Sequence, residues 1–167
     1  MITTQNDITV RVRTLATLLI RREQKLVTAE SCTGGLIAGA LTALAGSSVW
    51  FERGWVTYSN AAKTAELGVS TALIDAHGAV SEDVAAAMAA GARTMAKVDY
   101  AIAVTGIAGP DGGTPDKPVG TVCFGWATPT QTLTETHRFS GDRQQVREQS
   151  VAHALAGLIA LLMDATD

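Results

Sequence analysis

A serine, a cysteine and a threonine lie together between a predicted strand and a predicted helix. Residues 25–29 form an apolar run of strand length, and residues 36–44 carry apolar side chains at helical spacing. The segment between them contains Ser31, Cys32 and Thr33. Backbone N–H groups at the start of a helix lack partners within the helix, and the helix dipole favours negative charge there. Ser31 is therefore a candidate nucleophile, and the N–H groups around Cys32 and Thr33 are candidate donors to an oxyanion.

Two other interpretations of this segment are open. Serine and threonine at strand–helix junctions often serve only as N-caps, whose side chains bond to backbone N–H groups. Cys32 could itself be a nucleophile, because a helix N-terminus lowers the pKa of a thiol. The more common role of such a cysteine is that of a small packing residue.

A nucleophilic serine needs a base, and Lys63 is the candidate. It follows a predicted strand at residues 55–58 and lies one turn into a short helix that Asn60 is expected to cap. Partial desolvation and a nearby helix N-terminus lower the pKa of a lysine, which then acts as a neutral base. Tyr58, at the end of the strand, is a candidate to orient the lysine or to relay a proton. The alternative is an ordinary solvated lysine.

The three histidines are weaker candidates for the base. His77 precedes a glycine in a predicted turn, His137 lies on a predicted edge strand, and His153 lies inside the last predicted helix. None of them has a catalytic context in the sequence. No pair of cysteine or histidine residues has the spacing of metal ligands, so we predict neither a metal nor a cofactor.

A loop rich in glycine and proline follows the apolar run at residues 100–105, which is typical of a strand buried on both faces. Residues 106–118 contain four glycines and three prolines, and a loop of this length is a candidate binding loop. Its glycines lack the spacing of the nucleotide-binding motifs. If the strands before this loop and before Ser31 are parallel neighbours, the serine faces Thr105 and Gly106. The alternative is a purely structural loop.

The order of the predicted elements indicates the fold class. Helices alternate with strands, and two strands at residues 119–127 and 132–139 form a hairpin before the last helix, which Asp142 is expected to cap. This order predicts an α/β fold, a three-layer α/β/α sandwich with a mixed, mostly parallel sheet. The 167 residues suit a single domain at residues 1–167.

Net charge and hydropathy indicate which kinds of binding partner the sequence favours. A net charge of −3 argues against a nucleic-acid surface. Neither a signal peptide nor an apolar run long enough to cross a bilayer is present, so we expect a cytoplasmic protein without a membrane partner. The two cysteines do not form a disulfide framework. A small-molecule partner is expected, and a homo-oligomer is compatible with the sequence.

Seven motifs occur in order from about residue 8 to residue 163, nearly the whole chain. They are TAESCTGG at 28–35, GSS at 46–48, VTYSN at 56–60 with Lys63, HGAVSE at 77–82, VTGIAGPDGG at 104–113, KPVGT at 117–121 and GDR at 141–143. This pattern resembles the CinA C-terminal domain family, the bacterial nicotinamide mononucleotide (NMN) deamidases. The chain is similar to the stand-alone form of the family, without the additional N-terminal domain of larger relatives.

The resemblance implies an amidohydrolase that converts NMN to nicotinate mononucleotide and ammonia with a serine–lysine pair. The chemistry expected from the residues passes through an acyl-enzyme. On the matching positions, Ser31 would be the nucleophile and Lys63 its base, with Tyr58 and Thr105 nearby. The chemistry expected from the residues agrees, and candidate groups for the oxyanion and the substrate are Cys32, Thr33, Gly34, Thr105 and Gly106.

The substrate's 5′-phosphate needs donors, and Ser47, Ser48 and Arg143 are candidates by type and context. Each also has an ordinary interpretation, the serines as a turn and the arginine as a first-turn helix residue. One rival to the serine mechanism is an amidase that uses the Cys32 thiol. The other is a non-catalytic module that binds a pyridine nucleotide or has a regulatory role.

Overall fold

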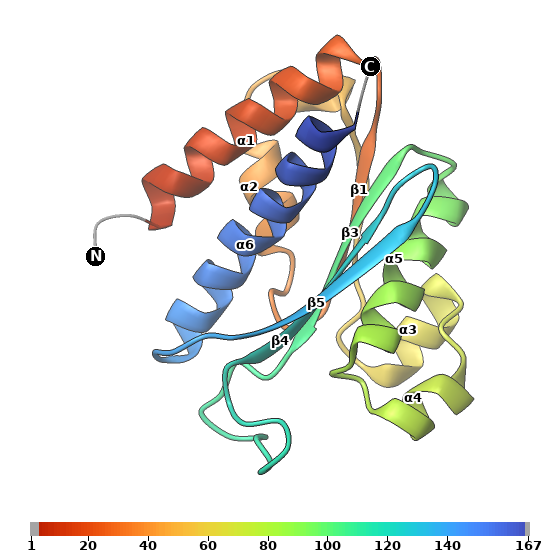
Figure 1. The fold of residues 1–167 in the computed structure, drawn as a ribbon, viewed down its shortest axis with the longest axis vertical. Coiled ribbons are helices and arrows are strands. Elements are labelled where there is room, and N and C mark those ends of the chain that lie inside the picture. Colours follow the sequence, from red (N-terminus) through yellow and green to blue (C-terminus); the bar gives the residue numbers. More distant parts are fainter. Residues whose placement is uncertain (1–3, 166–167) are drawn as a thin grey trace.

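A five-stranded sheet divides the molecule into two helical layers (Figure 1). The computed structural model describes residues 4–165. The strands are β1 (Leu26–Glu30), β2 (Phe51–Val56), β3 (Tyr100–Gly106), β4 (Thr121–Ala127) and β5 (Thr132–Arg138). The helices are α1 (Thr4–Arg21), α2 (Leu36–Thr42), the 3-10 turn η1 (Ser47–Val49), α3 (Asn60–Leu67), α4 (Thr71–His77), α5 (Glu82–Ala96) and α6 (Arg143–Asp164).

The strand order β2-β1-β3-β4-β5 brings the two predicted functional segments together. Strand β1 pairs in parallel with β2 and with β3, whereas β4 is antiparallel to both β3 and β5. Four of the five strands therefore run in one direction. The parallel neighbours β1 and β3 end at the same edge of the sheet, and so the serine turn and the loop after β3 meet there.

The alternation of side chains along β3 separates two cores. Ile102 and Val104 join a cluster with α1, α2 and α6, whereas Ala101 and Ala103 join a cluster with α3, α4 and α5. Figure 1 shows these two groups of helices on opposite faces of the sheet. The predicted three-layer α/β sandwich with a mixed sheet is confirmed.

Helix α3, which carries Lys63, packs closely on α5. A side-chain carbon at Gly91 of α5 would collide with the carbonyl oxygen of Leu67 at the end of α3. The predicted cap of α3 was wrong by one position: Ser59 is the N-cap and accepts a hydrogen bond from the Ala62 N–H, while Asn60 is the first helical residue.

Two other boundaries test the sequence analysis. Strand β2 begins at Phe51, four residues before the predicted strand, because it pairs with β1 from Leu26 onward. Asp142 caps α6 as predicted and forms a capping box with Gln145. Within residues 4–165, no helix combines the length and apolar character that crossing a membrane requires.

Candidate active site

The hydroxyl of Ser31 and the amine of Lys63 are in direct contact, with Nζ 3.0 Å from Oγ. Ser31 directly follows β1, and Lys63 lies in α3, which follows β2. Because β1 and β2 are parallel neighbours, the segments after them meet at one edge of the sheet. The fold thus brings together the two residues that the sequence analysis paired.

Lys63 is buried in a polar cradle. Its side chain is 1% exposed, so the solvated surface lysine considered above is excluded. Nζ also donates to the carbonyl oxygens of Thr57 at 2.9 Å and Tyr58 at 3.3 Å. Desolvation lowers the pKa of Lys63 below its ordinary value, because burial disfavours the ammonium.

Glu30, the last residue of β1, holds the serine turn in shape. It is fully buried, and its carboxylate accepts hydrogen bonds from the Thr33 hydroxyl at 2.6 Å, the Ile37 N–H at 2.8 Å and the Ala38 N–H at 3.0 Å. The sequence analysis missed this role. The available signal was a lone acidic residue at the end of an apolar strand, before a helix whose N-cap position is a glycine, Gly35.

The bonds to Glu30 occupy backbone N–H groups at the start of α2. Ile37 and Ala38 are in the first turn of α2, and their N–H groups are already occupied by the carboxylate. The first turn of this helix is therefore unavailable to a substrate.

The N–H group of Gly106, at the end of β3, points toward β1. The next residue, Ile107, donates its N–H to the carbonyl oxygen of Thr121, which lies on the β4 side of β3. Successive residues of a strand direct their N–H groups to opposite sides, so the N–H of Gly106 points toward the β1 side, where Ser31 lies.

Arg147 of α6 fixes the carbonyl groups of the serine turn. Its guanidinium donates to the Cys32 carbonyl at 3.1 Å through Nε and to the Thr33 carbonyl at 3.2 Å through Nη2. The sequence analysis did not identify this residue. Its position four residues after Arg143 was a usable signal, because residues at that spacing share one face of a helix.

A pocket of about 180 Å³ opens above the Ser31–Lys63 pair. The candidate site residues Tyr58, Thr105 and Gly106 line it. The remaining lining residues are Cys32, Asn60, Ala79, Val80, Ala108 and Arg143. Thr105 is buried, and its hydroxyl donates to the Ala79 carbonyl at 2.9 Å, so it braces the wall of the pocket.

Arg143 and Tyr58 form the rim of this pocket. Nη2 of Arg143 donates to the Tyr58 hydroxyl at 3.3 Å, and Nη1 donates to the Gly109 carbonyl at 2.8 Å. Tyr58 is 62% exposed, and its side chain is therefore open to solvent. The two residues join the end of β2, the loop after β3 and the first turn of α6.

Four predicted site residues lie outside the pocket lining. Thr33 is fully buried and bonded to Glu30, and Gly34 lies in the turn beside Arg147. Ser47 and Ser48 belong to η1, which leads into the start of β2. The start of β2 pairs with Leu26, at the start of β1. These two serines therefore lie at the opposite end of the parallel strands from Ser31.

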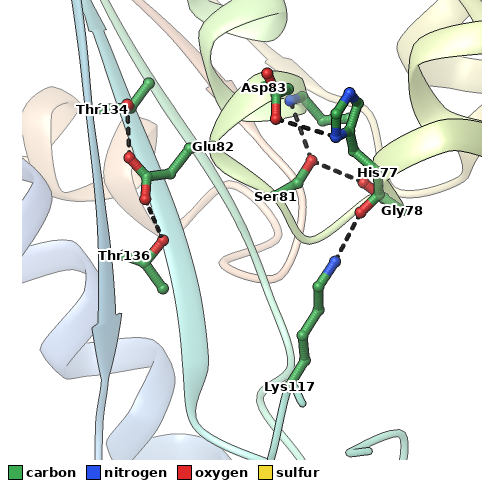
Figure 2. A network of polar contacts seen from close by, with 9 residues as sticks. His77, Gly78, Ser81, Glu82, Asp83, Lys117, Thr134 and Thr136 are labelled. Carbon is green, nitrogen blue, oxygen red and sulfur yellow. Dashed lines mark hydrogen bonds and ion pairs between the residues drawn. The ribbon is translucent and has the colours of Figure 1, made fainter.

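The loop after β3 is anchored on two sides. In addition to the bond from Arg143, Lys117 Nζ donates to the His77 carbonyl at 2.7 Å at the end of α4 (Figure 2). The ring of His77 faces away from this contact, and its Nδ1 lies 3.3 Å from a carboxylate oxygen of Asp83. His77 does not line the pocket that contains Ser31.

Burial suppresses the reactivity of the neighbouring thiol. Cys32 is 6% exposed, and desolvation raises the pKa of its thiol to about 12. The nearby Glu30 acts in the same direction. The thiol is therefore protonated near neutral pH, whereas the thiolate is the nucleophilic form.

The fold and the pocket define an α/β protein with a buried serine–lysine pair at the carboxyl edge of its parallel strands. The model of the CinA C-terminal domain family matches residues 9–162. The chain belongs to this family.

Named relatives and solved structures extend over nearly the same region. The chain is 51% identical to the nicotinamide-nucleotide amidohydrolase PncC of Pseudomonas putida, over 90% of this chain and 96% of that protein. It is 54% identical to PncC of Escherichia coli K12, over 82% of this chain and 84% of that protein. A crystal structure of the competence/damage inducible protein CihA from Agrobacterium tumefaciens superposes with a TM-score of 0.91 at 45% identity, covering 93% of this chain and 95% of that one.

A longer relative also matches. The chain is 55% identical to a putative competence-damage inducible protein of Symbiobacterium thermophilum, over 83% of this chain and 35% of that protein.

Proposed function

We propose that this protein hydrolyses the carboxamide of NMN to nicotinate mononucleotide and ammonia, with residues 1–167 as one amidohydrolase domain. The observation that carries the proposal is the 3.0 Å contact between Ser31 Oγ and the buried amine of Lys63. Relatives that are 51% and 54% identical are named nicotinamide-nucleotide amidohydrolase, which supports the choice of substrate.

The cradle of Lys63 suits a neutral amine that accepts a proton. A neutral amine has two N–H donors and one lone pair. Nζ has three acceptors in the structure, the Ser31 hydroxyl and the carbonyl oxygens of Thr57 and Tyr58. When the amine loses a proton, the two carbonyls, which can only accept, would keep its two hydrogens, and the lone pair would face the Ser31 hydroxyl, which can also donate. The lowered pKa of Lys63 increases the fraction of this neutral form.

The reaction would proceed through an ester of Ser31. Oγ attacks the carboxamide carbon while its proton passes to Lys63 Nζ. The ammonium then returns the proton to the amide nitrogen, the C–N bond breaks, and ammonia leaves. Water next gives a proton to Lys63 and attacks the ester carbonyl. Lys63 returns this proton to Oγ as the C–O bond of the ester breaks, which restores the Ser31 hydroxyl. The acid formed loses its proton to solvent and leaves as the carboxylate.

The tetrahedral intermediate carries an oxyanion that needs fixed donors. The N–H of Gly106 points to the side where Ser31 lies, and Cys32, which follows Ser31, also lines the pocket. We assign the oxyanion to these two residues. Thr105, which braces the opposite wall, would position the amide.

The pocket is small for a whole nucleotide. Its volume of about 180 Å³ is below the range of roughly 300–1,000 Å³ that drug-sized ligands occupy. The pyridine ring and its carboxamide would enter it, and the 5′-phosphate would remain at the rim. Arg143, with its planar guanidinium at that rim, is the proposed phosphate ligand.

The test is ammonia release from NMN by the purified chain, with nicotinate mononucleotide measured in parallel by chromatography. We expect equimolar products without an added metal and an unchanged rate in EDTA, because every proposed step uses protein side chains and water. NMN binding without ammonia release would instead favour the non-catalytic module. Loss of the rate in EDTA, with recovery on adding one divalent ion, would contradict the mechanism.

A further inference from the structure

Two histidines and a glutamate that the proposed reaction does not use converge on one spot. Glu135 and His137 lie on β5, and His153 lies on α6. One potential ligand atom from each residue lies within 4.8 Å of the other two. Glu135 and His137 are exposed and His153 is half-buried, so water and ions have access to this cluster.

The alternation of β5 explains why these side chains meet. Thr134 and Thr136 point to one face, where both hydroxyls bond to the carboxylate of Glu82 on α5 (Figure 2). Glu135 and His137 must therefore point to the other face, the side of α6. His153 contributes its side chain from that helix. The spacing of these three residues in the sequence does not predict that they lie together.

The position of His153 leaves a nitrogen available. Nε2 is buried and has no hydrogen-bond partner among residues 4–165, although Glu135 Oε2 lies 3.2 Å away in an arrangement without hydrogen-bond geometry. The ring packs at 4.7 Å from the Phe124 ring and at 4.9 Å from the His137 ring, measured between centroids. The aromatic packing holds the imidazole in place while its nitrogen faces a carboxylate.

We propose that Glu135, His137 and His153 form a binding site for a divalent transition-metal ion, with Zn²⁺ as the best fit. Imidazole nitrogens and a carboxylate oxygen are ligands that Zn²⁺ takes readily, whereas Ca²⁺ and Mg²⁺ prefer oxygen ligands alone. Three protein ligands leave a fourth position for water.

Little movement is needed to form the site. Bond lengths of about 2.0–2.2 Å in a tetrahedral site imply ligand atoms roughly 3.3–3.6 Å apart. The ligand atoms therefore close by about 1–1.5 Å at most, which side-chain rotation on an exposed edge strand allows. A bound ion would link β5 to α6, the helix whose first turn carries Arg143.

The experiment titrates Zn²⁺ into the tag-free, metal-stripped full chain by calorimetry. We expect one equivalent to bind, and we expect His137→Ala and Glu135→Gln each to weaken binding at least about tenfold. Both substitutions are on exposed positions, so circular dichroism should show the native fold. In the wild type, Zn²⁺ should raise the melting temperature, and at the same Zn²⁺ concentration the rise should be smaller in His137→Ala.

His77→Ala is the matched control. His77 is another partly exposed histidine beside a carboxylate, Asp83, but it lies outside the cluster (Figure 2). We expect this variant to bind Zn²⁺ with wild-type affinity. Co²⁺ gives a second readout, since visible absorption bands should appear with the wild type and His77→Ala and be absent with His153→Ala.

Either of two results would overturn the site. The first is a wild-type chain that takes up no Zn²⁺ in the titration. The second is an affinity that His77→Ala lowers as much as His137→Ala does, since the ion would then bind surface histidines without selection.

Discussion

The amine of Lys63 lies 3.0 Å from the hydroxyl oxygen of Ser31, although 32 residues separate them in the chain. Two parallel strands bring them to one edge of the sheet, and the carbonyls of Thr57 and Tyr58 hold the amine from the other side. A lysine in such a cradle has few orientations, so the distance between its amine and the Ser31 hydroxyl is fixed by the fold.

Replacing Ser31 with alanine removes the proposed nucleophile. We expect kcat for NMN to fall at least about 10³-fold. The fold should persist, because the substitution forfeits one hydrogen bond, worth about 0.5–1.5 kcal/mol. Thermal unfolding checks the fold. Ser70→Ala, which removes the serine that caps α4, should keep its activity. A folded Ser31→Ala enzyme with normal turnover would rule out the serine mechanism.

The pH dependence of the reaction tests Lys63. An ordinary lysine has a pKa near 10.4, and desolvation lowers the pKa of Lys63. Below its pKa, the residue is an ammonium and cannot accept the serine proton. We therefore expect kcat/KM to rise with pH and to level off well below pH 10, along a single limb. A flat profile between pH 6 and about pH 10 would contradict this role.

Lys63→Arg separates the base from a fixed positive charge. Guanidinium keeps the charge but stays protonated, so we expect this variant to lose at least about 10²-fold in kcat, as loss of a general base typically costs. Near-normal turnover would mean that the residue supplies only charge. The proton of Ser31 would then have to pass to another acceptor, such as a water molecule in the pocket.

Cys32→Ala tests the thiol alternative. Burial raises the pKa of the thiol to about 12, so the thiolate is scarce at neutral pH. We expect this variant to retain kcat within about threefold, which is about 0.65 kcal/mol in the barrier. Initial rates at saturating NMN measure the effect. An inactive but folded protein would favour a thiol amidase.

Substitution of Arg143 tests the proposed phosphate contact. A hydrogen bond to a charged group contributes about 1.5–3 kcal/mol, so Arg143→Ala should lower kcat/KM for NMN by roughly 10- to 150-fold. Nicotinamide riboside lacks the phosphate and serves as the control substrate. We expect its kcat/KM to change much less. Equal losses with both substrates would mean that Arg143 only supports the loop through Gly109.

Glu30→Gln tests the support of the serine turn. The amide group of glutamine has one acceptor oxygen, and its NH₂ group replaces the other. The backbone N–H of either Ala38 or Ile37 would then face a donor and lose its acceptor. Leaving a buried donor unpaired costs about 1–3 kcal/mol, which urea unfolding would measure. We expect kcat to fall as well, because the turn carries the nucleophile. Unchanged stability would show that the carboxylate is dispensable.

Local patterns in the sequence were sufficient for the elements and for the chemical identity of the central pair. The apolar run at residues 100–105 predicted a buried strand, and β3 is that strand. Asp142 and Gln145 predicted the start of α6, because a capping box depends only on residues three apart. Strand–turn–helix segments made Ser31 and Lys63 candidates, the motifs shared with the family favoured them as a pair, and their catalytic roles stay predictions.

Contacts between distant segments were decided only by the tertiary structure. The bond from Arg147 to the Cys32 carbonyl joins residues 115 positions apart and depends on how α6 packs beside the serine turn, so spacing along the chain could suggest the residue but not its partner. For the same reason, Ser47 and Ser48 lie at the far end of the strands from Ser31. Sequence patterns report spacing along the chain, whereas the order and direction of the strands determine which ends of the sheet the loops share.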